Sequence, residues 1–137
     1  MEKSNLTVKD IIVWRKSNPM PRNIDRRYVQ DMEFAVWCVK KNAKWVFNKD
    51  KNKPYMRSLI ETGTVSGAER TIHPTQKSLK LMEEIIKTHT NENDVVIDPF
   101  MGSGTTGVAC LSLNRKFIGV ELEKEYFDIS VDRIKKV

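Results

Sequence analysis

The chain has 137 residues and a formal net charge of +6, with 39% hydrophobic and 31% charged residues. This length suits one domain, and the composition is typical of a folded globular chain and not of a disordered one. The sequence has no apolar stretch as long as a membrane span and no apolar signal-peptide core at its N-terminus, so we expect a cytoplasmic protein without membrane association.

The positive charge is concentrated in the first part of the chain. Residues 1–57 hold 14 Lys and Arg against 6 Asp and Glu, whereas residues 58–137 hold 10 against 12. Such an excess is typical of a protein that binds a polyanion, although a solvated basic surface gives the same balance. The two cysteines, Cys38 and Cys110, stand in apolar runs, which favours buried, reduced thiols over a disulfide.

Strands and loops are expected in this first part. Short apolar runs rich in branched and aromatic residues predict strands over 11–14 and 34–39 and a shorter third strand over 44–47. Two prolines among polar residues predict a loop over 16–31, and polar, basic residues predict that 48–72 is mostly loop. We expect an antiparallel pair of strands at this end of the chain.

From residue 73 onward the pattern changes to alternating strands and helices. An apolar stripe at helical spacing comes first, followed by two strongly apolar strand segments and a closing amphipathic helix. A strand–helix–strand–helix order requires a parallel sheet with right-handed crossovers, so this part predicts an α/β fold. The predicted elements are a helix over 78–88, a strand over 94–98, a helix over 108–113, a strand over 117–122 and a helix over 126–136.

A glycine-rich turn lies between the first of these strands and its helix. Gly102, Gly104 and Gly107 form a G-x-G-x-x-G pattern, and Glu121 follows Gly102 by 19 residues at the end of the next strand. Glycines let the backbone turn tightly and approach a ligand, and an acid at that place can accept hydrogen bonds from two ribose hydroxyls. The arrangement predicts an adenosine-nucleotide site; the alternative is a glycine-rich turn with an incidental acid.

The residues between the strand and the glycines distinguish two adenosine cofactors. Asp98, Pro99, Phe100 and Met101 precede Gly102, whereas in a dinucleotide fold the glycines follow the strand almost at once. An anionic Asp98 at the strand tip would repel a pyrophosphate and would suit a cationic sulfonium or α-ammonium group. The residues therefore favour S-adenosylmethionine over NAD.

Three segments resemble the beta class of DNA amino-methyltransferases, which methylate adenine N6 or cytosine N4. Residues 98–106 (DPFMGSGTT) are similar to the family's cofactor motif, and residues 73–77 (HPTQK) to the segment that precedes it. Residues 14–23 (WRKSNPMPRN), followed by Glu33, Phe34 and Trp37, resemble the stretch after the family's catalytic strand. The order of these segments matches the C-terminal portion of a beta-class enzyme.

The resemblance implies a partial Rossmann-like fold of an S-adenosylmethionine-dependent methyltransferase, with parallel strands, crossover helices and the N-terminal antiparallel pair. We expect a single incomplete domain over residues 1–137. Within it, residues 1–47 would hold strands and a basic loop, 48–72 a loop or a remnant of the target-recognition element, and 73–137 the cofactor-binding part.

The resemblance also assigns cofactor contacts to individual residues. They fall on the strand tip, on the glycine turn, on the segment before it and on the acid after the next strand. Asp98 would face the methionine ammonium or nearby waters and Glu121 the ribose, while Thr75 and Lys77 would hold the carboxylate end. The full set is Thr75, Lys77, Asp98, Pro99, Phe100, Gly102, Ser103, Gly104, Thr105 and Glu121.

Double-stranded DNA is the partner that the resemblance implies. The basic loop would lie near it, with phosphate contacts from Arg22, Arg26 and Arg27, although a solvated loop has the same composition. His73 and His89 are isolated from other metal-binding residues in the sequence, so we expect no metal site.

One element of the family pattern is absent. The family's catalytic motif contains two adjacent prolines followed by an aromatic residue, and the five prolines here are never adjacent. We therefore expect no catalytic residue in this chain and no activity from it alone. The strand at Val95–Ile97 would then have a free edge, because the central strands of the family fold are missing. That edge would bind a missing N-terminal half or a second copy, or would be closed by 11–14 or 34–39 in a rearranged sheet.

Three hypotheses about function follow. The leading one is a site-specific DNA methyltransferase of a restriction–modification system that uses S-adenosylmethionine, with adenine N6 favoured over cytosine N4. The second is a non-catalytic cofactor- or DNA-binding remnant. The third is a fragment of an NAD-binding oxidoreductase, which binding of S-adenosylhomocysteine or of NAD would distinguish from the other two.

Overall fold

A computed structural model describes residues 5–137, which begin with three strands and continue with alternating helices and strands. No helix within this range is long and apolar enough to cross a membrane. The strands are β1 (Leu6–Lys16), β2 (Met32–Lys40), β3 (Leu59–Thr62), β4 (Val95–Asp98) and β5 (Lys116–Gly119). The helices are α1 (Leu79–His89), α2 (Thr105–Ser112) and α3 (Lys124–Ile134), and a 3₁₀ turn, η1, covers Gly67–Glu69.

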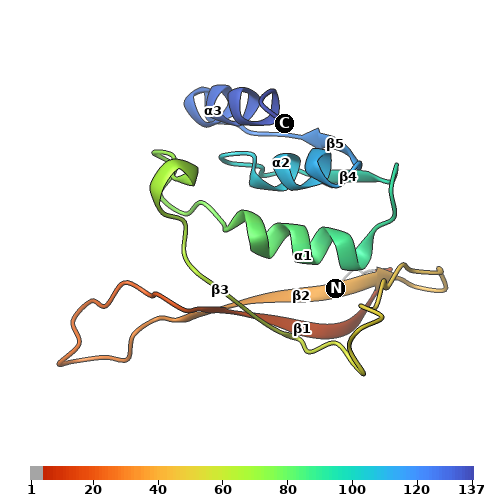
Figure 1. Cartoon of the computed structure of the whole chain (residues 1–137), viewed down its shortest axis with the longest axis horizontal. Helices are drawn as coiled ribbons and strands as arrows, with labels where there is room; N and C mark the ends of the chain where they lie inside the picture. Colours follow the sequence, from red (N-terminus) through yellow and green to blue (C-terminus); the bar gives the residue numbers. More distant parts are fainter. Residues whose placement is uncertain (1–4) are drawn as a thin grey trace.

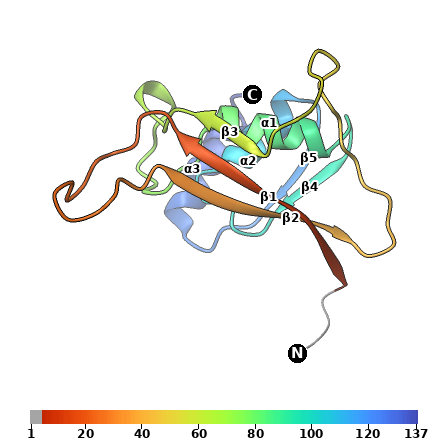
Figure 2. The same ribbon diagram turned by 90° about the horizontal axis from the view of Figure 1, so that it is seen from below.

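The strands form two sheets. In the first, β1 lies between β2, to which it is antiparallel, and β3, to which it is parallel. In the second, β4 pairs in parallel with β5, and α2 is the crossover between them. Figure 2 shows β1, β2 and β3 side by side in front of the helices. The expected antiparallel pair and the expected parallel strand–helix–strand unit are both confirmed.

Helix α1 connects the two sheets. Figure 1 shows α1 lying between the first sheet and α2, with α3 beyond α2. Ile86 of α1 packs against Ala109 and Cys110 of α2, and Val96 of β4 and Phe117 of β5 complete this core. Both cysteines of the chain are free thiols, and burial raises the pKa of Cys110 to about 11. Cys110 is therefore an unreactive core residue.

The prediction of a strand over 44–47 is wrong. This segment has no regular structure. Phe47 stacks on Trp37 of β2 with ring centroids 5.6 Å apart, and the backbone N–H of Asn48 donates to the carbonyl of Thr88 in α1 at 2.7 Å. Phe47 therefore packs over β2 and the end of α1, and the segment is held there without pairing as a strand.

The loop expected over 48–72 contains β3. This strand has four residues, which is too short for an alternating pattern to be recognised in the sequence. It is held by parallel pairing with the end of β1 and by the indole N–H of the buried Trp14, which donates to Thr62 Oγ1 at 2.8 Å. A long-range contact, and not local sequence, therefore decides that this segment is a strand.

The expectation of a rearranged sheet, in which 11–14 or 34–39 pairs with the strand at Val95–Ile97, is also wrong. Neither β1 nor β2 pairs with β4, and within residues 5–137 the sole strand partner of β4 is β5. Helix α1 packs against both α2 and β3, which separates the two sheets. The second edge of β4 is accordingly without a strand partner in this part of the chain.

Candidate functional site

The glycine turn lies where the two parallel strands of the second sheet end. Asp98 is the last residue of β4, and its carbonyl accepts a hydrogen bond from the N–H of Val120 at 2.9 Å. The N–H of Met101 in turn donates to the Val120 carbonyl at 3.0 Å. The turn is thereby fixed against the chain that follows β5, at the carboxyl edge where ligands of open α/β sheets bind.

Two carboxylates mark this edge. Glu121 accepts from the N–H of Gly102 at 2.8 Å and from the N–H of Glu123 at 3.0 Å. The hydrogen bond from Glu123 and the one from Gly102 hold the pKa of Glu121 below its usual value despite some desolvation. Asp98 accepts from Thr106 Oγ1 at 2.6 Å and from the N–H of Phe100 at 3.1 Å. The edge of the sheet therefore presents negative charge beside backbone amides.

The inner side of the turn is held by α3. Arg133 donates from one guanidinium nitrogen to the Ser103 carbonyl at 2.6 Å and to the hydroxyls of Ser103 and Thr105, both at 3.1 Å. Ser103 and Thr105 are buried. Gly104 has φ of +75°, and a Cβ there would lie 2.7 Å from Cβ of the buried Ser130. The turn is thus packed against α3, and residues 101–105 are all buried.

The segment before α1 reaches this turn through His73. A Cβ on Gly102, whose φ is +52°, would lie 2.7 Å from Nε2 of His73, so the imidazole and the glycine backbone are in close contact. The imidazole stacks edge-on against Tyr126 of α3, and its Nδ1 is buried without a hydrogen-bond partner among the described residues. The two motifs that the sequence singled out, 73–77 and 98–106, are therefore neighbours in space.

Gln76 and Glu69 fix the same segment from within. The Gln76 side chain accepts from the N–H of Thr71 at 2.8 Å and donates to the carbonyl of Glu69 at 2.7 Å. The Glu69 carboxylate accepts from the N–H of Leu79, the first residue of α1, at 2.9 Å. The residues between these contacts are consequently held in one conformation at the start of the helix.

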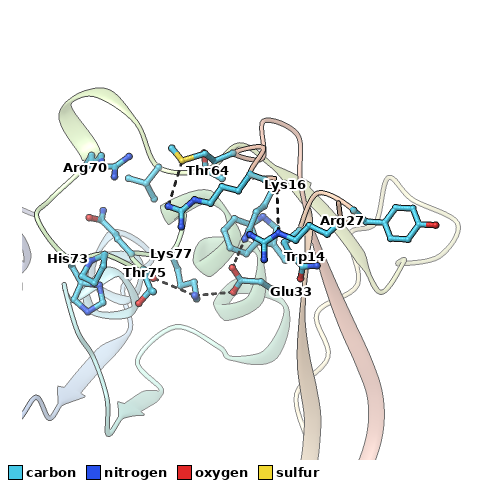
Figure 3. A pocket seen from close by; sticks show the side chains of 16 residues that line it. Trp14, Lys16, Arg27, Glu33, Thr64, Arg70, His73, Thr75 and Lys77 are labelled. Atoms are coloured by element: carbon cyan, nitrogen blue, oxygen red, sulfur yellow. Dashed lines mark hydrogen bonds and ion pairs between the residues drawn. The ribbon is translucent and has the colours of Figure 1, made fainter. Parts of the chain in front are cut away.

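A basic cavity of about 420 Å³ opens beside this segment (Figure 3). It lies between the end of the β1–β2 hairpin, the loop that joins these strands, and the segment before α1. Its cationic side chains come from all three parts of the chain, and its walls include Trp14 and Val65. The cations are Lys16, Arg22, Arg27, Arg70 and Lys77, and the one carboxylate that lines the described cavity is Glu33.

Glu33 joins two of these cations. Its carboxylate pairs with Lys16 at 2.8 Å and with Lys77 at 3.0 Å (Figure 3). Partial burial acts to raise the pKa of Glu33, but the two lysines outweigh it and hold that pKa below its usual value. Lys77 also approaches the carbonyl of Thr75 at 3.4 Å. The pair fixes the ammonium of Lys77 at the wall of the cavity.

The structure sorts the predicted site residues into two groups that meet at His73. Thr75, Lys77, Arg22 and Arg27 line the basic cavity, whereas Arg26 is exposed and does not. Asp98, Gly102 and Glu121 lie together at the sheet edge. Pro99 and Phe100 come directly after Asp98, and Phe100 is 88% exposed. The hydroxyls of Ser103 and Thr105 accept from Arg133, and both residues are buried.

Sequence reasoning missed Glu33 and Arg133 as site residues. Arg133 gave no signal, because tertiary structure alone places Ser130 and Arg133, three residues apart on α3, against the turn. Glu33 belongs to the stretch that resembles the family, but the sequence gave no signal for its role, since its partners Lys16 and Lys77 are brought to it by tertiary structure alone. No group of three or more potential metal ligands lies among residues 5–137.

A family model described as DNA methylase matches residues 1–132, and the chain therefore belongs to this family. It is 35% identical over 145 residues to the Type II methyltransferase M2.LlaDCHI of Lactococcus lactis subsp. cremoris, covering 99% of this chain and 54% of that protein. It is 36% identical to M2.DpnII of Streptococcus pneumoniae, covering 98% and 54%. The chain thus spans about half the length of the curated relatives that it matches.

Solved structures agree with the fold. The chain is 65% identical to the M1.HpyAVI–SAM complex with a TM-score of 0.87, covering 95% of this chain and 63% of that one. The PvuII DNA methyltransferase (cytosine-N4-specific) has the same fold at 23% identity, with a TM-score of 0.76 and coverage of 93% and 51%. The expected family and the expected Rossmann-like methyltransferase fold are both confirmed.

Proposed function

We propose that this chain is the cofactor-binding and DNA-contacting portion of a DNA methyltransferase that uses S-adenosylmethionine and belongs to a restriction–modification system. The proposal is carried by one observation: a carboxylate-bearing turn and a strongly basic cavity meet at His73. The relatives named Type II methyltransferases support the assignment to a restriction–modification system. The SAM complex of M1.HpyAVI supports S-adenosylmethionine as the cofactor. Its place of action would be the cytoplasm.

The groups at the site fit this cofactor. S-adenosylmethionine carries an ammonium group, a ribose diol, a carboxylate and a sulfonium, and when bound it supplies an electrophilic methyl group. Asp98 offers an acceptor for the ammonium group at the tip of β4, and Glu121 offers one for the ribose after β5. Lys77, with Thr75 beside it, would bind the carboxylate. Phe100 would cover the cofactor with its exposed ring.

The negative charge of Glu121 at the glycine turn argues against NAD as the cofactor. A pyrophosphate at the start of α2 would lie beside the ionised Glu121, whose acceptor atoms already take the N–H of Gly102 that a phosphate would need. This chain therefore favours a zwitterionic, sulfonium-bearing adenosine over a dinucleotide. A remnant that binds cofactor or DNA without catalysis is the second proposal.

DNA would lie over the loop that joins β1 and β2. Arg22 and Arg27 line the basic cavity, and the exposed Arg26 lies on the same loop, so the three would contact phosphates without reading sequence. Residues 48–72 are the proposed remnant of the target-recognition element, within a single incomplete domain. We propose adenine N6 as the methylated atom; product analysis of a complete enzyme distinguishes it from cytosine N4.

Calorimetry tests the cofactor proposal. The chain should bind S-adenosylhomocysteine and not NAD, and Glu121→Ala should weaken binding by about 1–3 kcal/mol because the ribose loses a charged acceptor. Glu123→Ala is the matched control, since it removes a neighbouring carboxylate but keeps the N–H that donates to Glu121. Equal affinity of Glu121→Ala and the unchanged chain would show that the ribose assignment is wrong.

Activity tests the catalytic part of the proposal. The chain of 137 residues lacks two adjacent prolines, so it should transfer no labelled methyl group to DNA on its own. Transfer above the background of a sample without the chain would contradict this expectation.

A further inference from the structure

Most of the excess positive charge of residues 1–57 lies outside the loop that joins β1 and β2. That loop, over 17–31, holds three Arg against two Asp, whereas residues 40–53 hold six Lys against one Asp. Residues 40–53, the lysine segment, therefore supply five of the eight charges by which Lys and Arg exceed Asp and Glu in residues 1–57. All six lysines of the segment are exposed: Lys40, Lys41, Lys44, Lys49, Lys51 and Lys53.

The lysine segment lies at the end of the first sheet that is remote from the cofactor side. Glu33, next to the start of β2, forms an ion pair with Lys77 before α1. Lys40, at the end of β2, is instead the ladder partner of Leu6 at the start of β1. Figure 1 shows the loop over 17–31 at the left end of the sheet and the lysine segment at the right end. The 9 residues of β2 that separate them span about 30 Å.

Tertiary contacts fix the backbone of the lysine segment. The side chain of Asn48 donates to the carbonyl of Thr90 at 2.8 Å, directly after the end of α1. Lys9 of β1 adds a seventh ammonium group, which lies 3.8 Å from the ring centroid of the half-exposed Trp45. The cations are therefore presented from one ordered surface and not from a loose basic tail.

Most ammonium groups of the lysine segment have no carboxylate partner among residues 5–137. The ion pair of the segment within this range joins Lys53 to Asp50 at 3.6 Å, and Lys49 donates to the carbonyl of Pro54 at 3.0 Å. Exposed cations of this kind bind phosphates by displacing condensed counterions, and they read no sequence. Four lysines make no ion pair and no side-chain hydrogen bond with the described residues: Lys40, Lys41, Lys44 and Lys51.

We propose that the lysine segment is a second surface for duplex DNA, which binds the phosphate backbone independently of the loop over 17–31. The inference rests on the proposed function for the identity of the polyanion, because the chain belongs to a family of DNA methylases. The segment holds DNA that lies away from the cofactor side, and so keeps the protein on the duplex without reading its sequence. A duplex of about 30 base pairs, at about 3.4 Å each, is long enough to reach both surfaces.

Two triple variants with the same loss of charge test this surface. Fluorescence anisotropy measures their binding to a mixed-sequence duplex of about 30 base pairs over a salt series. The segment variant removes three lysines that make no ion pair with the described residues: Lys41→Gln, Lys44→Gln and Lys51→Gln. The control variant removes three exposed lysines of β5 and of the chain after α3: Lys116→Gln, Lys135→Gln and Lys136→Gln.

The segment variant should bind DNA about tenfold more weakly, and its salt slope should be shallower by about 2.7, the contribution of three phosphate contacts. The control variant should change neither quantity. Acetylation of the unchanged chain, read by mass spectrometry, gives a second measurement that does not depend on the folding of a variant. Duplex DNA should protect Lys41, Lys44 and Lys51 from acetylation and should leave Lys135 and Lys136 reactive.

A third variant separates this inference from the proposed function. Combining the segment variant with Gln at the three loop arginines should add the two losses of DNA-binding free energy, because the surfaces are far apart. The segment variant alone should bind S-adenosylhomocysteine as the unchanged chain does. Equal effects of the segment and control variants, no protection of the segment lysines, or equal protection by a polyglutamate peptide would each overturn the inference. None of these results would affect the cofactor proposal, which loss of S-adenosylhomocysteine binding by the unchanged chain would contradict.

Discussion

Arg133 is the residue on which the shape of the glycine turn depends most directly. It supplies hydrogen bonds to the carbonyl and hydroxyl of Ser103 and to the hydroxyl of Thr105, all of which are buried. Arg133→Met keeps the length of the side chain and removes the donors, so the free energy of unfolding should fall by about 2–3 kcal/mol. Urea denaturation measures this change, with Lys135→Met at the exposed end of α3 as the control. Equal losses for the two variants would rule out the role of Arg133.

Glu33 makes the stability of the cavity depend on pH. The two lysines hold the pKa of Glu33 below its ordinary value of 4.5, so its stabilising effect is complete above that pH and is lost as pH falls through the lowered pKa of the folded state. Glu33→Gln should therefore be less stable than the unchanged chain near neutral pH, and the difference should shrink below pH 4.5. Thermal unfolding between neutral and acid pH measures it; a difference that is constant with pH would contradict the ion pairs.

The joint between α2 and α3 depends on the absence of a side chain at Gly104. Its φ of +75° disfavours any residue with a Cβ, and that atom would lie 2.7 Å from Cβ of Ser130. Gly104→Ala should lower the free energy of unfolding by about 2–4 kcal/mol, the sum of backbone strain and overpacking. Gly67→Ala is the matched control, because Gly67 has φ of +59° with no atom within 4 Å and so suffers the strain alone, about 1–2 kcal/mol. A loss no larger at Gly104 than at Gly67 would refute the packing argument.

Most elements could be predicted from local pattern, because their apolar residues recur at the period of a helix or form a run between turn residues. The predicted helix over 78–88 is α1 at Leu79–His89, and the predicted strand over 94–98 is β4 at Val95–Asp98. The errors lie at 44–47 and in β3, where short segments carry no periodicity and their partners are distant in sequence.

At the scale of the whole molecule, the basic excess of residues 1–57 should make DNA binding strongly dependent on salt. Each phosphate contacted contributes a slope of about −0.9 to the logarithm of affinity against the logarithm of salt concentration. Arg26→Ala should make that slope shallower by about 0.9, the contribution of one phosphate contact. The reason is that the Arg26 side chain is exposed on the loop between β1 and β2. Lys136→Ala, after α3, is the control and should not change it. Fluorescence anisotropy over a salt series measures both, and equal slopes for Arg26→Ala and the unchanged chain would remove Arg26 from the interface.

The sequence by itself determined the parallel unit around the glycine turn, its acid after the next strand and the family to which the chain belongs. These features are local: a strand, a turn and a helix follow one another within 95–112, and the chemistry of Asp98 and Glu121 depends on their places at the end of β4 and just after β5. Tertiary structure alone decided that the loop arginines share a cavity with Lys77 and that Glu33 joins Lys77 to β1. It also decided that one face of the β4–β5 pair stays open, because burial depends on which elements pack against a strand and not on the strand's own residues.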